Sequence, residues 1–253
     1  MKLKNVLAGL KYKSIHGRLD KEIKDICINS KDAKKASLFA AIKGYNADGH
    51  DYIEDAVKTG ACAVLCERAD KLLDDVTYIF TDNVRAELAK AAANFYQTDK
   101  NTERLFLTAI TGTNGKSSTA SILDCILNKN DIKCSMSTTT GMYMGGEKLN
   151  DNLNTTPDAL TVHKFISDSV RLGCKACVIE ASAHAATLHR TDNIKFKYGI
   201  FTNLSPEHLD FYSNVEEYYK AKEAIMEQCD ICIVNSDDVY GKRLIKRLTS
   251  LNK

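Results

Sequence analysis

The stretch Ile110-Thr111-Gly112-Thr113-Asn114-Gly115-Lys116-Ser117 decides the fold. It closes an apolar run that begins at Leu105, and a helical pattern follows it to about Asn128. A glycine-rich turn between a strand and a helix directs backbone N–H groups and the positive end of the helix dipole at one point. Phosphate is the natural occupant. We therefore predict an ATP site in which Lys116 reaches the β/γ-phosphates and the Ser117 hydroxyl completes a Mg²⁺ shell.

The match to the common phosphate-loop pattern is incomplete. Ile110 stands where that pattern requires a glycine. An ordinary glycine turn is the alternative explanation, but the motif demands a strand before it and a helix after it, and the sequence supplies both.

The alternation of apolar runs with helical patterns along the chain predicts an α/β fold in two domains. At 253 residues and 44% hydrophobic content the chain is long enough for two cores. In the first hundred residues apolar runs at 38–42, 61–65 and 77–80 alternate with helical stretches at 52–58 and 84–96, and the polar stretch 97–103 marks a boundary. We thus expect an N-terminal α/β domain over 1–100 and a P-loop-type, mostly parallel α/β central domain over 101–253. In the second, strands at 105–111, 176–180, 198–202 and 230–235 alternate with helices at 116–128, 158–172 and 215–228.

Composition narrows the function classes. The net charge is only +2, with 35 basic against 33 acidic side chains, which disfavours a nucleic-acid partner. Lys11 and Lys13 interrupt the apolar start before a signal-peptide core could form, and no stretch of about 18 apolar residues occurs. We expect a soluble, cytoplasmic protein with no membrane partner.

Four of the nine cysteines form two CxxC pairs, Cys174/Cys177 and Cys229/Cys232. The two pairs are separated by much more than the roughly 15–20 residues of a zinc ribbon. Cys177 and Cys232 also sit in apolar runs that are typical of buried strands, where a free thiol acts as a small hydrophobe. We therefore expect reduced thiols rather than a structural zinc site.

Polar residues follow the predicted strands at their carboxyl ends, where ligands collect in parallel sheets. Glu180 ends one strand, and His208 follows another. Together with Ser117 they could hold one or two Mg²⁺ ions, although imidazole is an unusual magnesium ligand. A single histidine is usually just hydrogen-bonded or exposed, so it is the joint placement that indicates a site. Lys222 lies in an amphipathic helical pattern that by itself predicts a surface lysine.

Several segments in one order resemble the Mur ligase family and, within it, the MurE type of UDP-N-acetylmuramoyl-tripeptide synthetases. The resemblance runs from about residue 20 to the end. Its further marks are Thr155–Asp158, Glu180–His184, His189–Arg190, Phe201–Leu204, His208–Asp210 and Asn235–Asp238. In the first domain, Asn29–Lys31, Leu38–Ala41 and Gly44–His50 resemble the uridine-binding module of that type.

The resemblance implies a role for each matched residue. The UDP end would be held by Ser30, Tyr45, Asn46 and Ala47, and the muramoyl peptide by Thr155, Thr156, Ser182 and Arg190. Nucleotide would contact Gly112, Thr113, Asn114, Gly115, Lys116, Ser117, Ser118, Asn235 and Asp237. Metal would be held by Ser117, Glu180, His208 and Lys222, the last as a carbamate formed with CO₂. Lys116, Lys222 and His208 would be catalytic.

The implied reaction is ATP-driven amide formation in peptidoglycan synthesis. A carboxylate of the UDP-N-acetylmuramoyl dipeptide attacks the γ-phosphate, and the amine of an incoming amino acid then displaces phosphate from the acyl phosphate. The sequence departs from the family at Asn29 and Ala183, where an aspartate and a second serine are usual, and at Ser117-Ser118, where two threonines are usual.

The resemblance also implies a third, carboxyl-terminal domain that this sequence lacks. We expect a fragment, a remnant, or a split gene product completed by a separate chain. Two alternatives stay open. One is a non-catalytic module that binds a UDP-muramoyl peptide or ATP, and the other is another Mur-type or a folylpolyglutamate-type ligase, which should lack the Gly44–His50 pattern.

Overall fold

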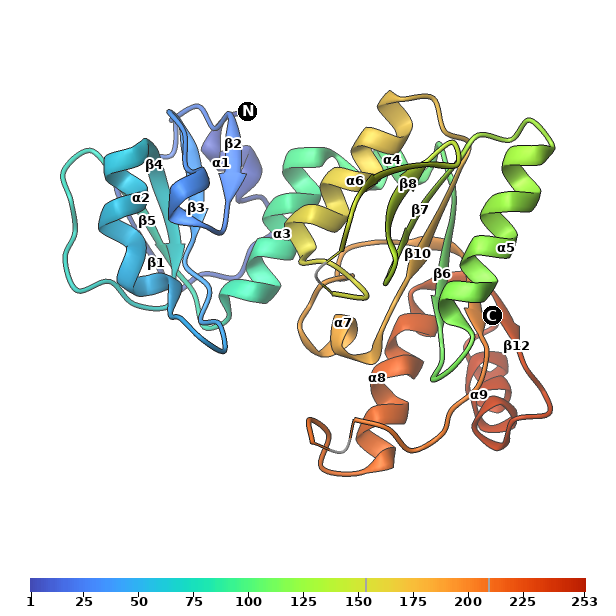
Figure 1. Cartoon of the computed structure of the whole chain (residues 1–253). Helices are drawn as coiled ribbons and strands as arrows, with labels where there is room; N and C mark the ends of the chain where they lie inside the picture. Colours follow the sequence, from blue (N-terminus) through green and yellow to red (C-terminus); the bar gives the residue numbers. More distant parts are fainter. Residues whose placement is uncertain (153, 209) are drawn as a thin grey trace. The chain divides into compact units, whose positions relative to one another are not determined.

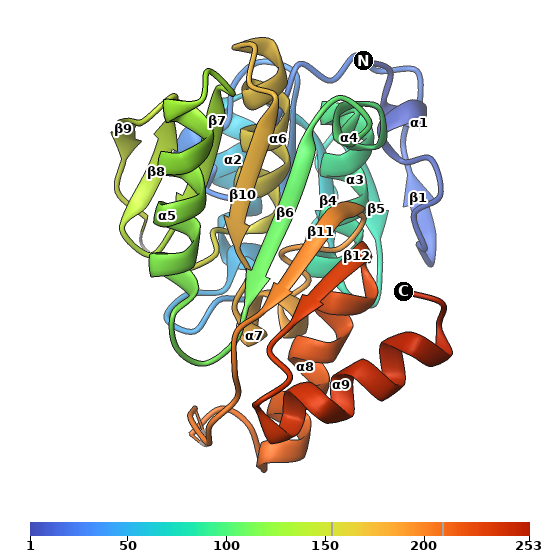
Figure 2. The same cartoon turned by 90° about the vertical axis from the view of Figure 1, so that its right-hand side faces the viewer.

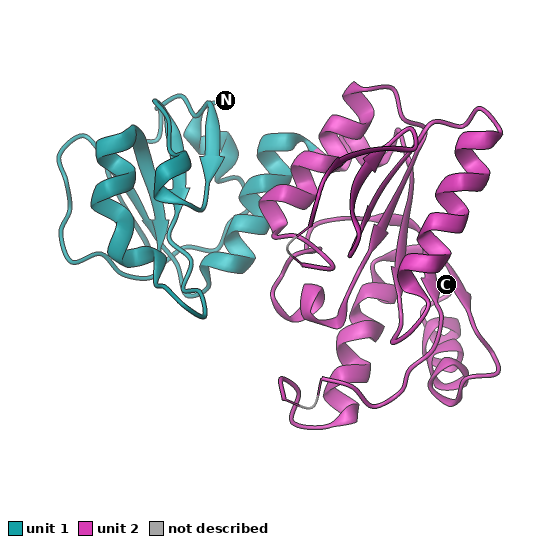
Figure 3. Cartoon of the chain, viewed as in Figure 1, with its two compact units in different colours: residues 1–97 teal, residues 98–253 magenta. Residues whose placement is uncertain are grey.

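The computed structural model describes residues 1–152, 154–208 and 210–253, so Leu209 of the His208–Asp210 motif lies outside the described residues. The chain divides into two compact units, Met1–Gln97 and Thr98–Lys253 (Figures 1 and 3). Both are α/β, as the sequence predicts, and each contains one mostly parallel sheet. Within the described residues no helix is both long enough and apolar enough to cross a membrane.

The sheet of the first unit has the order β1-β5-β4-β3-β2, and only β1 runs antiparallel to its neighbour. Its core contains Phe39, Val64 and Tyr78. Gly60 ends the helix before β4 at a φ of 131°, and a Cβ there would lie 2.7 Å from the backbone of Lys34. The strands are β1 Ser14–His16, β2 Asp25–Cys27, β3 Ser37–Ala40, β4 Ala61–Cys66 and β5 Thr77–Phe80, and the helices are α1 Leu3–Val6, η1 Ser30–Asp32, η2 Gly49–Tyr52, α2 Ile53–Thr59 and α3 Val84–Tyr96.

The second unit is built on a seven-stranded sheet of order β12-β11-β6-β10-β7-β8-β9. The first five of these strands are parallel, and β8 and β9 add an antiparallel hairpin at the far edge. The strands are β6 Phe106–Thr111, β7 Cys134–Thr138, β8 Gly141–Met144, β9 Glu147–Asn150, β10 Ala176–Glu180, β11 Phe196–Phe201 and β12 Cys229–Val234. The helices are α4 Thr98–Thr102, α5 Lys116–Lys129, α6 Ala159–Arg171, α7 Ala183–Thr187, α8 Val215–Glu227 and α9 Val239–Ser250.

Helices lie on both faces of this sheet, because side chains alternate between the faces along each strand (Figure 2). On the α5 face, Ile110 and Val178 pack with Ala120. On the other face, Leu107 and Ile179 pack with side chains of α6 and α8. This arrangement brings the carboxyl ends of β6, β10 and β11 to one edge of the sheet, where the polar segments begin.

The sequence predicts that the stretch 97–103 contains a domain boundary and little to bury. The two units divide between Gln97 and Thr98, within that stretch, but residues 98–102 form α4, and the buried Thr98 hydroxyl lies 2.7 Å from His163 Nδ1 of α6. The strand predicted at 230–235 exists as β12, but it is not buried: Ile231 and Ile233 are 47% and 55% exposed. The apolar run was misleading because β12 is an edge strand.

The loop between β6 and α5 contains two glycines with positive φ angles but different surroundings. At Gly112, φ is 145° and an added Cβ would lie 2.0 Å from Thr202 Oγ1. At Gly115, φ is 84° and an added Cβ would meet nothing within 4 Å. Gly112 is therefore required for the close approach of two chain segments, whereas Gly115 is required only for its backbone angle.

We predict that Gly112→Ala destabilises the second unit by at least about 2 kcal/mol, because strain and overlap add. Gly115→Ala is the matched control and should cost about 1 kcal/mol, the price of the angle alone. Urea denaturation followed by circular dichroism measures both. Equal effects of the two substitutions would contradict the close approach at Gly112.

Candidate active site

The turn after β6 is fixed by the segment that follows β11. Thr113 N donates to the Asn203 carbonyl oxygen at 2.9 Å, and Asn114 N donates to Asn203 Oδ1 at 3.0 Å. Ser205 N donates to Thr113 Oγ1 at 3.0 Å. The loop shape thus depends on two parallel neighbours, β6 and β11, as well as on its own glycines. Asn203 has this role in the structure, although the sequence pattern did not assign it one.

Ser117 and Lys116 converge on Glu180 from the start of α5. Ser117 Oγ donates to Glu180 Oε2 at 2.8 Å, and Lys116 Nζ lies 3.9 Å from Glu180 Oε1. Lys116 Nζ also donates to the Thr113 carbonyl oxygen at 2.7 Å. Burial lowers the pKa of Lys116, and the nearby Glu180 carboxylate opposes that change. The phosphate-loop residues and the predicted strand-end carboxylate therefore form one cluster.

Thr139 is a member of this cluster that sequence reasoning missed. Its backbone N donates to Glu180 Oε2 at 3.0 Å, and its hydroxyl lies 3.3 Å from the same atom. The hydroxyl also donates to Thr155 Oγ1 at 3.1 Å. Three consecutive threonines at 138–140 were the available signal, but the strand that leads into them, β7, was not predicted because serines alternate with its apolar residues.

The four residues expected to hold a muramoyl peptide lie next to Glu180. Thr156 Oγ1 donates to the Glu180 carbonyl oxygen at 2.7 Å, and Ser182 N donates to Thr156 Oγ1 at 3.0 Å. Arg190 Nη1 donates to the Thr156 carbonyl oxygen at 2.6 Å. Thr155 joins them through Thr139. The four are brought together by the ends of β10 and α7 and the loop before α6.

Lys222 is not the surface lysine that its helical pattern predicts. It is 1% exposed, and its Nζ donates to the Gly112 carbonyl oxygen at 2.6 Å. The same nitrogen lies 4.4 Å from the ring centroid of Tyr218, one turn earlier on α8. Burial, with a smaller contribution from Lys116, lowers the pKa of Lys222 to about 7. The pattern failed because α8 turns this face toward the phosphate loop.

His208 lies in a group of rings beside Lys222 rather than in contact with Glu180. Its ring centroid is 4.9 Å from that of His184 and 6.0 Å from that of Tyr218. Burial, followed by the charge of His208, lowers the pKa of His184. His208 has a φ of 57°, in the left-handed region. The structure therefore brings His208 to the edge that carries Lys222 without a direct contact between His208 and Ser117.

Asn235 and Asp237 follow β12 at the same edge of the sheet. Asn235 Nδ2 donates to the Thr202 carbonyl oxygen at 2.9 Å, and Asp237 N donates to Asn235 Oδ1 at 3.0 Å. The next residue, Asp238, caps α9 and also accepts from Leu204 N at 3.2 Å. The segment after β12 is thus joined to the segment after β11.

Oxygen donors at this edge suit a magnesium ion. Ser117 Oγ and Glu180 Oε2 lie 2.8 Å apart, and Mg²⁺ in nucleotide sites is typically held by one or two carboxylates, a hydroxyl and substrate phosphates. Among residues 1–152, 154–208 and 210–253 no group of three or more His, Cys, Asp or Glu side chains could hold a metal ion. The donor set therefore fits a metal that shares its coordination with phosphate, not a closed structural site.

The first unit has a cavity of about 340 Å³ that Ser30 and Ala47 both line, together with Asn29, Phe39 and Tyr52. Two other residues expected to hold a UDP group, Tyr45 and Asn46, are exposed and do not line it, and Tyr45 is 78% exposed. Nearby, Asp48 accepts from Arg68 Nη2 at 2.9 Å, and hydrogen bonds from His50 hold the pKa of Asp48 well below its usual range.

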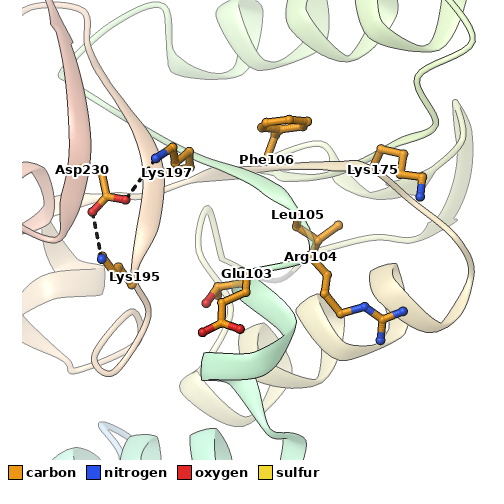
Figure 4. Close-up of a pocket in the computed structure, with 9 residues that line it drawn as sticks. Glu103, Arg104, Leu105, Phe106, Lys175, Lys195, Lys197 and Asp230 are labelled. Atoms are coloured by element: carbon orange, nitrogen blue, oxygen red, sulfur yellow. Dashed lines mark hydrogen bonds and ion pairs between the residues drawn. The ribbon is translucent and has the colours of Figure 1, made fainter.

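A further cavity, of about 380 Å³, lies at the amino-terminal ends of the strands of the second sheet (Figure 4). Lys195 and Lys197 flank Asp230 at 3.2 and 3.5 Å, and Phe106 lies between Lys197 and Lys175 in the view. None of the residues predicted for phosphate, metal or peptide lines this cavity. It is separate from the carboxyl ends of the strands, where the glycine loop lies.

Comparison with known proteins identifies two family matches that together span most of the chain. Residues 110–252 match the Mur ligase middle domain, and residues 22–108 match the Mur ligase family catalytic domain. A UDP-N-acetylmuramoyl-L-alanyl-D-glutamate--2,6-diaminopimelate ligase of Clostridium tetani is 37% identical over 251 residues, which are 98% of this chain and 51% of that protein. A ligase of the same name, numbered 1, from Clostridium acetobutylicum is 38% identical over 97% of this chain and 50% of its own length.

A solved structure of a ligase with the same name has a TM-score of 0.80 and 21% identity to this chain, and covers 99% of it and 50% of the other chain. At that identity the likeness concerns the fold. The chain spans about half the length of the curated relatives that it matches.

The buried Lys222 predicts a pH dependence of stability. Its pKa in the folded protein is about 7, below the ordinary 10.5, so between these values the unfolded chain binds more protons than the folded one. Stability should therefore rise with pH, by about 2 kcal/mol between pH 7 and 9 from this group alone.

Lys222→Met, which keeps the length of the side chain without its charge, should remove that rise, and Lys220→Met at an exposed position of the same helix should retain it. Urea denaturation of the three proteins at pH 7, 8 and 9 measures the difference. A slope that is the same in all three would refute the lowered pKa.

Proposed function

The chain belongs to the Mur ligase family, and from that premise we propose that it is the nucleotide-binding part of an ATP-dependent acid–amino-acid ligase. The proposed substrate is UDP-N-acetylmuramoyl-L-alanyl-D-glutamate, the molecule in the names of its relatives, and the proposed product extends its peptide by one amino acid. We propose that the reaction takes place in the cytoplasm, where ATP is available. The observation that carries the proposal is the convergence of Lys116 and Ser117 on Glu180 at the ends of β6 and β10.

In the proposed reaction the peptide carboxylate attacks the γ-phosphorus of ATP, and ADP leaves. Two anions must approach each other, so catalysis rests on positioning and on neutralisation of charge. Lys116 is suited to this because its buried ammonium lies at the glycine loop, 3.9 Å from Glu180 Oε1, and Glu207 is a second carboxylate that acts on it. The amine of the incoming amino acid then displaces phosphate from the acyl phosphate, and an amide forms.

A Mg²⁺ ion bound at Ser117 and Glu180 would supply positive charge at the phosphate oxygens. The carboxylate of Glu180 is held by Thr139 and Ser117, which fixes the direction of its oxygen Oε2. Thr156, Ser182 and Arg190, connected to the same strand end, would hold the acceptor peptide beside the phosphate loop. Asn235 and Asp237 would lie near the adenine.

We propose that Lys222 carries a carbamate in the active protein. The reaction adds the free amine to CO₂ and releases one proton, so it requires a neutral lysine. A pKa of about 7 makes about half of the Lys222 side chains neutral at pH 7. The remaining N–H of a carbamate could still donate to the Gly112 carbonyl oxygen, and its new negative charge would face Lys116. His208, in the adjacent ring group, would complete this side of the site.

The first unit would bind the uridine diphosphate group in the cavity lined by Ser30 and Ala47. Tyr45 and Asn46 are exposed on the same loop and would close over the ligand. The two-domain division of the sequence then corresponds to two binding tasks, the nucleotide-sugar in 1–100 and ATP in 101–253. A second candidate function, a module that binds both ligands without turnover, is favoured by the half-length match to the relatives. A separate chain that supplies the remaining domain is part of the proposal.

The discriminating experiment mixes the chain with ATP, Mg²⁺, UDP-N-acetylmuramoyl-L-alanyl-D-glutamate and either diaminopimelate or lysine, and measures phosphate release. Release that requires all components supports the ligase and identifies the amino acid. Nucleotide-sugar binding without release supports the binding module for this chain. Calorimetric titration that detects no affinity for the UDP-sugar would instead favour a folylpolyglutamate-type ligase.

We predict that Lys116→Ala raises the Kd for ATP roughly tenfold or more, because a charge-assisted contact to phosphate is lost. The Kd for the UDP-sugar should change by less than about twofold, since the first unit is proposed to bind that ligand. Lys129→Ala, at the exposed carboxyl end of the same helix, is the control and should leave both constants unchanged. Isothermal titration gives all the values. Equal weakening of both ligands by Lys116→Ala would contradict the two-site division.

A further inference from the structure

The cavity of about 380 Å³ at the amino-terminal ends of the strands has no role in the proposed ligase site (Figure 4). Its lining runs from Thr102, at the end of α4, through the start of β6 to Asp230 of β12. All of its lining residues belong to the second unit. Small-molecule sites commonly have volumes of about 300–1,000 Å³, so the cavity is large enough for one ligand of the size of a mononucleotide.

The lining of this cavity carries a surplus of positive charge. Its acidic members are Glu103 and Asp230. Its basic members are Arg104, Lys175, Lys195 and Lys197. Asp230 is shared between two of them, because its carboxylate oxygens lie 3.2 Å from Lys195 Nζ and 3.5 Å from Lys197 Nζ. Four cations against two carboxylates leave a formal charge of +2 around the cavity, which equals the net charge of the whole chain.

Arg104 and Lys175 provide this surplus. In the part of the chain that the structure describes, neither side chain has a hydrogen-bond or ion-pair partner. A lysine at these strand ends can instead bind the end of a helix: Lys133 Nζ donates at 2.9 Å to the carbonyl oxygen of Leu172, the residue that follows α6. Arg104 and Lys175 make no such contact, and both are exposed. They are therefore available to an anionic ligand.

Phe106 adds an open aromatic surface beside the cations. It is 58% exposed, although the other five residues of β6 are buried. Its backbone N donates to the Lys175 carbonyl oxygen at 2.9 Å, and its ring lies between Lys175 and Lys197 in Figure 4. Because β6 is paired on both sides, with β10 and β11, the strand that positions this ring is held in the middle of the sheet. An aromatic ring of this kind can stack on a nucleobase, while the cations beside it bind phosphate.

We propose that this cavity binds a nucleoside phosphate, whose base stacks on Phe106 and whose phosphate groups contact the cations of the lining, foremost Arg104 and Lys175. Both parts of the ligand are needed. A base without phosphate would leave the cations without a partner, and a bare anion would leave the ring exposed. The site is distinct from the glycine loop, which lies at the carboxyl ends of the same strands, and it does not rest on the proposed ligase function.

The chain contains no tryptophan, so a single substitution provides a local probe. Phe106→Trp introduces the only tryptophan at an exposed position, and its fluorescence reports on this cavity. Titration of this protein with ADP in the absence of Mg²⁺ should give saturable quenching, because the adenine ring stacks on the indole. Adenosine, which lacks phosphate, should bind about tenfold more weakly, and pyrophosphate should compete with ADP.

The contribution of the cations is tested in the same Phe106→Trp protein. Arg104→Ala with Lys175→Ala should raise the Kd for ADP about tenfold or more, since two charge-assisted contacts to phosphate are lost. Lys129→Ala with Lys164→Ala is the matched control, because it removes two exposed lysines of the same unit that do not line the cavity. The control should change the Kd by less than about twofold. Circular dichroism checks that each variant is folded.

Lys116→Ala separates this cavity from the proposed ATP site. It should leave the quenching by ADP unchanged, whereas loss of the quenching in this variant would assign the signal to the glycine loop and overturn the second site. Quenching that does not saturate below about 5 mM ADP, or an equal Kd in the double variant and its control, would also overturn it. Tighter binding of a short polyglutamate peptide than of ADP would replace the nucleotide by an acidic protein segment.

None of these measurements involves turnover. A failure of nucleotide binding at Phe106 leaves the ligase proposal intact, and an absence of phosphate release leaves the second nucleotide site intact.

Discussion

The carbonyl and Cα of Gly112 form the contact on which the rest of the second unit depends. The carbonyl oxygen accepts from the buried Lys222 of α8, and the Cα lies so close to Thr202 that no side chain fits. Three segments far apart in the sequence, after β6, after β11 and within α8, are thereby held at one edge of the sheet. The phosphate loop has its shape because these contacts leave the backbone no other path.

This junction determines the electrostatics at the carboxyl ends of β6, β10 and β11. Two lysines, Lys116 and Lys222, are buried near the carboxylates of Glu180 and Glu207, and burial lowers the pKa of each lysine. Burial outweighs the opposing effect of the two carboxylates, so a further anion beside the lysines would favour their ammonium forms. The triphosphate of ATP is the anion proposed for this site. The lowered pKa of Lys222 is also the basis of its proposed reaction with CO₂.

The sequence was sufficient for the elements with strong local signals and insufficient where the signal came from distant partners. β5, β10 and α3 have the bounds that apolar periodicity predicts, and the glycine loop lies where its motif requires. The prediction for Lys222 is wrong because nothing on α8 itself indicates that the carbonyl oxygen of Gly112, 110 positions away, accepts a hydrogen bond from its Nζ. Thr139 was missed for a related reason: its partner Glu180 lies on a strand that is adjacent only in the folded sheet. Residue types can be read from the sequence, but their convergence depends on strand order.

Strand order also explains why β12 has an apolar sequence although it is an edge strand. A parallel strand buried on both faces has a continuous apolar sequence, and β12 has that sequence but lies at an edge. Its isoleucines are therefore typical of an interior strand, although β12 lies at an edge and Ile231 and Ile233 are exposed. The strand at the other edge, β9, is shorter and carries the charged residues Glu147 and Lys148, as edge strands commonly do. An apolar run therefore predicts a strand but not its place in the sheet, because that place is set by the order in which the strands pair.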